Sequence, residues 1–331
     1  MSRGFATDVV QLGGSAGVEL RQGATDPTTA GGVAAPLNSL YYQTSTSLVW
    51  QKIGAAATAW VSLTPQALFG DGSDGPVTIA AGTTTLAKDT FATDLTVQNG
   101  GILVMAGFRL WVRGTLNVQA GGTIRYNGAA AAGTAGAGNT AAGTWGTTTG
   151  GGGASTTTNG NNGTGSAVAL PGFGGSGGAG GTGAGGAAGN GGTITVATAA
   201  RGNLRNLIAG GWGQFFSTAG SQVTWGSGGG GGAGSGATAG GGGGAGGGGV
   251  MIFAHDIINS GAIEAKGGAG FTTGTANAGG GGGGGGGLII LGFHTFAGTA
   301  PDVSGGAGGN GGAGGGNGAN GNAGVYVPLQ L

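Results

Sequence analysis

Short apolar segments alternate with glycine-containing turns between Val77 and Asn127. Apolar residues take every second position in Leu95-Thr96-Val97 and in Leu116-Asn117-Val118, as in a strand with one face in a core. Regular short strands of this kind suit a β-sandwich or a β-solenoid, and we favour the solenoid because the turns at 99–102 and 119–124 repeat the same chemistry. The strands predicted here are Val77–Ile79, Thr84–Leu86, Leu95–Val97, Ile102–Met105, Leu110–Val112, Leu116–Val118 and Thr123–Arg125.

The C-terminal third contains an internal repeat. Val250–Gly270 aligns without a gap on Leu288–Gly308, an offset of 38 residues (288 minus 250). Both copies follow a glycine run, and 194–211 is a looser relative. A repeat of this size indicates stacked units that cover one another's apolar faces. The gapless alignment pairs His255 with Phe293, Asp256 with His294 and Glu264 with Asp302.

Glycine provides 94 of the 331 residues and dominates residues 128–192. Such density normally favours disorder, because glycine loses the most backbone entropy on folding and buries no side chain. Collagen requires abundant proline, and the chain has only 7 prolines. A flexible linker also fits the composition. Because glycine runs lead directly into apolar strands, we instead expect polyproline-II-like glycine chains packed side by side, with backbone groups paired between neighbours.

Residues 1–65 predict a small β domain. A turn and a strand at 33–44 precede a hairpin partner at 48–53 and a third strand at 59–63. The motifs Val33–Tyr41, Leu48–Gly54 and Thr58–Trp60 resemble a short module of tailed-bacteriophage structural proteins, with Asn38 where that family more often has glycine. The resemblance implies a virion component, often a trimeric fibre or spike; the alternative is an ordinary hairpin of a small β domain. The candidate virion-attachment residues are Tyr41, Tyr42, Trp50 and Trp60.

Residues 190–331 resemble the glycine-rich fibres of phages and microbial cell surfaces. In some phage adhesins, such runs form stacked polyglycine helices that present loops to a host receptor. The resemblance implies stacked helices at 228–249 and 279–287. Aromatic side chains lie in stretches of small residues, where they either contact the host or fill the interior or a trimer seam. The candidate host-contact residues are Trp145, Trp212, Phe215, Phe216 and Trp225.

Charge and composition exclude several classes of protein. With 10 basic and 10 acidic residues, the chain lacks the electrostatic footprint of a nucleic-acid binder. It has no cysteine for disulfides or thiolate metal sites. Neither a secretion signal nor an apolar run of membrane-spanning length is evident, so we expect synthesis in the host cytoplasm, no membrane insertion and a final location in the virion. The uncharged stretch between Arg125 and Arg201 indicates self-association.

Candidate chemistry is sparse. Gly-x-Gly-x-x-Gly matches are expected by chance here and lack the helix and lysine of a phosphate loop. Asp71 and Asp74 fit either a calcium loop or Asx turns. The alignment separates the two histidines, and Asp256 with Glu264 does not resemble a tuned glycosidase pair. We therefore predict no catalytic residues, no metal site and no cofactor.

These patterns predict an all-β protein without a long α-helix. It comprises a β-hairpin domain at 1–65, a β-solenoid or sandwich shaft at 66–127 and a glycine-rich domain at 128–331 with short strands and packed polyglycine-II helices. The expected function is that of a non-enzymatic phage fibre or spike, a homotrimer bound to other virion proteins and, distally, to a host glycan or protein. The alternatives are a capsid-decorating head fibre without a receptor, and a microbial surface protein, which the missing export signal disfavours.

Overall fold

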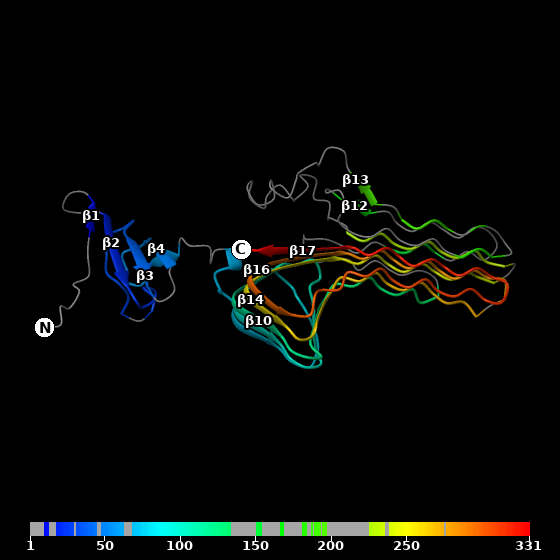
Figure 1. The fold of residues 1–331 in the computed structure, drawn as a ribbon, viewed down its shortest axis with the longest axis horizontal. Coiled ribbons are helices and arrows are strands. Elements are labelled where there is room, and N and C mark those ends of the chain that lie inside the picture. Colours follow the sequence, from blue (N-terminus) through cyan, green and yellow to red (C-terminus); the bar gives the residue numbers. More distant parts are fainter. Residues whose placement is uncertain are drawn as a thin grey trace. The chain divides into compact units, whose positions relative to one another are not determined.

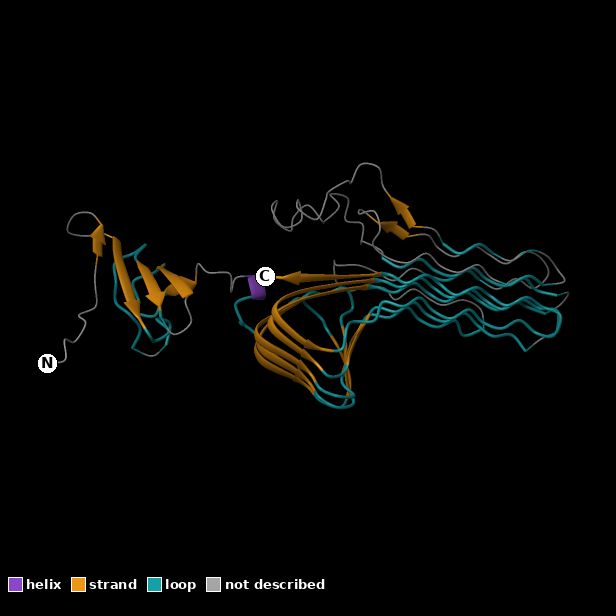
Figure 2. Cartoon of the chain, in the orientation of Figure 1, coloured by secondary structure: helices purple, strands orange, loops and turns teal. Residues whose placement is uncertain are grey.

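The computed structural model describes residues 10–12, 18–29, 31–44, 48–62, 68–133, 150–153, 166–168, 181–183, 187, 189–192, 194–196, 225–235, 238–274 and 276–331. The chain divides into two compact units, Met1–Asp71 and Gly72–Leu331. Within the described residues, strands and extended segments are interrupted by a single helical turn, at Leu68 and Phe69 (Figure 2). For the residues that the structure describes, the prediction of a mostly stranded protein without a long α-helix is confirmed. No helix in the described part is long and apolar enough to cross a membrane.

The first unit contains a five-stranded sheet in the order β1-β2-β3-β4-β5. Neighbouring strands are antiparallel except for β2 and β3, which are parallel. The last three strands correspond to the predicted ones, whereas the short β1 and the charged, alternating β2 were not predicted. The strands are β1 (Val10–Leu12), β2 (Val18–Gly23), β3 (Leu40–Gln43), β4 (Leu48–Lys52) and β5 (Trp60–Ser62).

Three aromatic residues, Tyr41, Trp50 and Trp60, form the core of this first unit. The ring centroids of Tyr41 and Trp60 lie 5.8 Å apart, and Trp60 Nε1 donates to the carbonyl oxygen of Val33 at 2.9 Å. Asn38, two residues before β3 begins, has a φ of 66°. This left-handed conformation is tolerated by asparagine and favoured by glycine, which explains why either residue fits there.

The second unit is built on two parallel sheets, ordered β17-β16-β14-β10-β8-β6 and β15-β11-β9-β7 (Figure 1). From β6 to β11 and from β14 to β16, successive strands alternate between the sheets, and β17 follows β16 in the same sheet. Every neighbouring pair is parallel. We call these two sheets the strand core. The six-stranded sheet contains β6 (Gly75–Ile79), β8 (Thr90–Val97), β10 (Leu110–Val118), β14 (Gly249–Asn259), β16 (Leu288–Gly298) and β17 (Val325–Gln330). The four-stranded sheet contains β7 (Gly82–Thr85), β9 (Gly101–Val104), β11 (Thr123–Arg125) and β15 (Ala262–Glu264). A separate parallel pair is formed by β12 (Ser166–Val168) and β13 (Ile194–Val196).

In-register stacking of apolar residues makes the interior of the strand core. Ile79, Val97 and Val118 lie at one level of the six-stranded sheet, and Leu103, Ile124 and Ile263 lie at one level of the other. All six belong to one buried cluster that also includes residues of β14 and β16. The alternating pattern read from the sequence therefore identifies inward positions correctly. The predicted boundary at residue 127 does not separate compact units, because β14 to β17 extend sheets that begin with β6 and β7.

One predicted turn proves to be a bulge within a strand. The sequence suggests separate strands at Leu110–Val112 and Leu116–Val118, but the structure has one strand, β10, with a register shift between them. Asp94 Oδ1 accepts a hydrogen bond from the backbone N of Thr115 at 2.8 Å, and a Cβ on Gly114 would lie 2.4 Å from the same oxygen. The glycine thus makes room for a carboxylate from the neighbouring strand instead of reversing the chain.

The strand core continues directly into extended glycine-rich segments that lie side by side (Figure 2). We call them the glycine array, and in the described residues its members include 225–234, 240–248, 265–273, 279–287, 303–312 and 315–324. The backbone N–H groups of Gly279, Gly282 and Gly285 donate to 233, 230 and 227. Those of 280, 283 and 286 donate to 316, 319 and 322, and those of 281, 284 and 287 donate to 271, 268 and 265. Every third N–H group of 279–287 therefore donates to the same neighbouring segment, so this one segment is hydrogen-bonded to three others.

Close approach, rather than unusual backbone conformation, makes glycine necessary in the array. A Cβ on Gly243 would lie 2.0 Å from the carbonyl oxygen of Gly229, and one on Gly283 would lie 1.9 Å from that of Gly306. Neither glycine has a positive φ. Outward positions carry side chains, as at the exposed Ala307 and Asn310, whereas the intervening Gly309 is buried. The side chains buried inside the array are few and mostly small, such as those of Ala233, Ala245 and Ser227.

We predict that Gly243→Ala destabilises the second unit by about 3 kcal/mol or more, because the added methyl group collides with backbone that cannot move alone. Gly274→Ala is the matched control, since a Cβ there meets nothing within 4 Å. Thermal unfolding followed by circular dichroism measures both changes. Equal unfolding midpoints for the two variants would contradict the role assigned to close packing.

Candidate functional site

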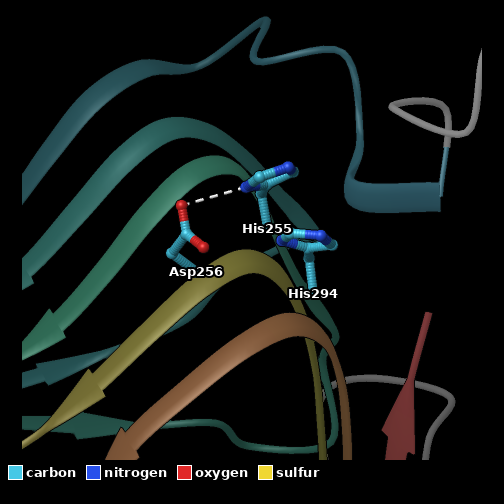
Figure 3. A group of neighbouring side chains, drawn as sticks. All are labelled: His255, Asp256 and His294. Carbon is cyan, nitrogen blue, oxygen red and sulfur yellow. Dashed lines mark hydrogen bonds and ion pairs between the residues drawn. The ribbon is translucent and has the colours of Figure 1, made fainter.

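Two histidines and an aspartate gather on the six-stranded sheet. His255, Asp256 and His294 offer ligand atoms that all lie within 4.8 Å of one another (Figure 3). In the described part of the chain, this is the only group of three or more His, Asp or Glu side chains close enough to share an ion. We call it the histidine cluster.

The register of two parallel strands creates the histidine cluster. Ala254 pairs with Phe293 and Asp256 pairs with Thr295, so His255 of β14 lies beside His294 of β16. The ring centroids are 4.9 Å apart, with an angle of 27° between the ring planes. Neighbouring positions of parallel strands face the same side of a sheet, which brings the two imidazoles together.

The gapless sequence alignment is wrong over these strands. The strand pairing has an offset of 39 residues (293 minus 254), whereas the bridge between Glu264 and Asp302 returns to 38 (302 minus 264). The connection after β14 is therefore one residue longer than the connection after β16. A slip of one residue turns every side chain of a strand to the opposite face, so the alignment separated two histidines that the structure stacks.

Hydrogen bonds hold the carboxylate of the cluster. Asp256 Oδ2 lies 2.9 Å from His255 Nδ1, and Asp256 Oδ1 accepts a hydrogen bond from Thr295 Oγ1. Burial acts to raise the pKa of Asp256, but the hydrogen bonds from Thr295 and His255 and the charges of the two imidazoles bring it below the ordinary value. The carboxylate is ionised at neutral pH. His294 is exposed and the other two side chains are about one-third exposed, at 38% and 35%, so an ion in solution can reach the cluster.

A second polar group lies where the strand core meets the glycine array. Lys266 Nζ lies 2.8 Å from Glu264 Oε1 and 3.6 Å from Asp302 Oδ2. Asn127 Nδ2 donates to Glu264 Oε2 at 2.8 Å, and Asn127 Oδ1 accepts from the backbone N of Lys266 at 2.8 Å. The hydrogen bond to Glu264 contributes most to raising the pKa of Lys266. These contacts join adjacent chain segments. Because Lys266 pairs with both carboxylates, the group does not resemble a catalytic acid–base pair.

The carboxylates considered as a glycosidase pair occupy different sheets. Asp256 belongs to β14 and interacts with His255 and Thr295, whereas Glu264 belongs to β15 and interacts with Lys266 and Asn127. In the Asp71–Asp74 loop, Asp74 pairs with Lys88 and accepts a hydrogen bond from the backbone N of Phe91 at 2.8 Å. Both carboxylate oxygens of Asp74 thus have protein partners 14 and 17 residues further along the chain, so these contacts tie the loop to β8 and the connection before it.

Three of the four proposed attachment residues face inward in the first unit. Tyr41, Trp50 and Trp60 are 3%, 7% and 5% exposed, so their rings stabilise the sheet and do not present a surface. Tyr42, on the opposite face of the strand from Tyr41, is 39% exposed. Only Tyr42 therefore remains a candidate surface contact. Alternation along β3 turns Tyr41 inward, and Trp50 and Trp60 pack with Tyr41 in the core.

Of the five aromatic residues proposed to contact the host, the structure describes one, Trp225. Trp225 is 1% exposed and lies at the start of a glycine segment, so it fills the interior as the alternative interpretation holds. The other four candidates, Trp145, Trp212, Phe215 and Phe216, lie outside the described residues.

No protein-family model, curated protein or solved structure matches this chain. Its function is therefore inferred from its own residues. Sequence reasoning missed the histidine cluster, although a signal for it exists. Moving the repeat alignment by one residue pairs His255 with His294 and keeps apolar partners, such as Ile252 with Leu291, together.

We predict that the second unit loses stability as the pH falls below about 4. Asp74, Asp256 and Asp302 have folded-state pKa values below the ordinary 3.8. A lowered pKa stabilises the fold above the unfolded-state value, and that contribution disappears as the pH falls through the folded-state value. Thermal midpoints between about pH 6 and pH 2.5 measure the effect. The Asp256→Asn variant should lose less over this range, and a midpoint that stays constant in the wild type would refute the prediction.

Proposed function

We propose that this chain is a non-enzymatic structural protein of a tailed-phage virion, a homotrimeric fibre or spike. The first unit attaches to other virion proteins, and the glycine-rich part binds the host surface. The observation that carries the proposal is the glycine array, a closely hydrogen-bonded body whose buried part consists almost wholly of backbone. Such a body offers stiffness and little chemistry, as a fibre requires.

We interpret the strand core as a β-solenoid and the array as packed polyglycine-II helices. The chain alternates between two parallel sheets with residues in register, which is the geometry of a stacked coil. The hydrogen bonds of 279–287 repeat every third residue, the period of a helix with three residues per turn and no internal hydrogen bonds. The coil aligns the helices at 240–248, 265–273, 279–287 and 315–324 because each of these enters or leaves it through a strand.

The ends of the glycine segments remote from the sheets are the best place for host contact. The chain reverses between 235 and 238, between 272 and 278, and between 312 and 316 (Figure 1). The other ends of 240–248, 265–273, 279–287, 303–312 and 315–324 lead to the strand core. Two of these turns contact each other, since the backbone N of Asn277 donates to the carbonyl oxygen of Ala313 at 2.7 Å. Turns fixed to a stiff body suit receptor recognition, because little entropy is lost when they bind.

A capsid-decorating protein without a receptor is the second candidate. Its support is the plain chemistry of the array surface, where the exposed residues of 303–324 are small or uncharged polar ones. They are Ser304, Ala307, Asn310, Ala313, Gly314, Asn317, Ala319, Asn320, Asn322 and Ala323. A surface without aromatic or charged anchors is unusual for a strong binding site.

Adsorption measurements distinguish the two candidates. We predict that the purified full chain competes with intact virions for host cells, and that virions carrying a chain without residues 128–331 adsorb at least ten-fold less. The full chain with Gly243→Ala should compete poorly, whereas Thr83→Gln, at an exposed position of β7 outside these turns, should compete like the wild type. Normal adsorption by the truncated virions would refute the adhesin and favour the decorating protein.

The trimer is tested separately. Light scattering after size-exclusion chromatography should give about three times the chain mass of 30.4 kDa. A mass equal to one chain, at micromolar concentration and without denaturant, would refute the homotrimer and leave the virion role open.

A further inference from the structure

We propose that the histidine cluster binds one divalent transition-metal ion of the Zn²⁺ type, through the imidazoles of His255 and His294 and the carboxylate of Asp256. This proposal is independent of the virion role. Imidazole nitrogen suits Zn²⁺, Ni²⁺ and Cu²⁺, and a carboxylate oxygen completes a familiar three-ligand set with water in the remaining position. Ca²⁺ and Mg²⁺ instead require mostly oxygen ligands, which the cluster does not supply.

The sheet prearranges the three ligands. His255 and Asp256 lie on β14, His294 lies on β16, and hydrogen-bonded strands flank both of them, β10 on one side and β17 on the other. The backbone positions are therefore set before any ion binds. Figure 3 shows the two imidazoles one above the other with the carboxylate beside them. This arrangement reduces the entropy lost when the ligands converge.

Only a small side-chain movement separates this arrangement from a bound one. Zn²⁺ lies about 2.0–2.2 Å from nitrogen and oxygen ligands, so its ligand atoms are roughly 3.3 Å apart. The three ligand atoms here already lie within 4.8 Å of one another. Rotation of the exposed His294 ring and of the partly exposed His255 ring closes that difference without moving the strands.

Thr295 supplies the supporting contact. Its hydroxyl donates to Asp256 Oδ1, while Oδ2 is the oxygen that faces His255 Nδ1. A hydrogen bond to one carboxylate oxygen orients the other toward a metal, as is common around metal sites. Thr295 is thus a positioning residue for Asp256.

Isothermal titration of the full chain with ZnCl₂ tests the proposal. We expect one Zn²⁺ per chain and a loss of affinity of at least ten-fold in each of His255→Gln, His294→Gln and Asp256→Asn. Thr83→Gln, at an exposed position of β7, is the matched surface control and should bind like the wild type. Unchanged circular dichroism spectra will show that the substitutions leave the fold intact, as expected at partly exposed positions.

Two further measurements identify the ligands. Co²⁺ in place of Zn²⁺ should give visible absorption bands of low coordination number, which the His255→Gln/His294→Gln double variant should lack. Millimolar CaCl₂ should not displace Zn²⁺. The proposal is overturned if the wild type shows no saturable Zn²⁺ binding, if the double variant binds as tightly as the wild type, or if Ca²⁺ competes. None of these outcomes bears on adsorption to host cells.

Discussion

The absence of a Cβ atom is the constraint on which the second unit depends. Carbonyl oxygens of neighbouring segments lie so close that a Cβ added to Gly243 or Gly283 would be only about 2 Å from one of them. That closeness lets backbone N–H groups pair with three neighbours in turn. Ordering glycine is costly in entropy, and these segments bury few apolar side chains to offset it. Backbone hydrogen bonds and dispersion contacts at close packing must therefore supply much of the stabilisation.

The strand core provides what the glycine array lacks. Its stacked Leu, Ile and Val side chains are excluded from water and form one cluster across both sheets. The junction is closely packed: the ring of Tyr126 lies against Gly248, and burial raises the pKa of Tyr126 to about 12. A glycine segment has almost no side chains whose packing could set its register relative to its neighbours. The packing of the apolar strand that adjoins the segment therefore sets this register.

Charged and titratable side chains are distributed unevenly between the strand core and the glycine array. In the described residues of the second unit, both histidines and most charged side chains belong to the strand core and its connections, and Lys266 lies in the array two residues after β15. The array surface carries serine, alanine and asparagine at outward positions. Outward side chains also prevent further segments from adding to the array, much as charged residues protect the edge strand of a sheet.

The sequence alone determined the class of structure and most inward positions, because strand alternation and glycine density are local properties. The strands at 77–125, the hairpin at 40–52 and the pairing of Glu264 with Asp302 could all be predicted from local pattern and repeat. Only the tertiary structure decided which segments are neighbours. Gly114 lies in a bulge because Asp94 occupies the space beside it, and Trp225 is buried although its sequence surroundings resemble a loop. The histidine cluster depends on a one-residue difference between two connections, which a gapless repeat conceals, since register is set by packing across strands and not by order along the chain.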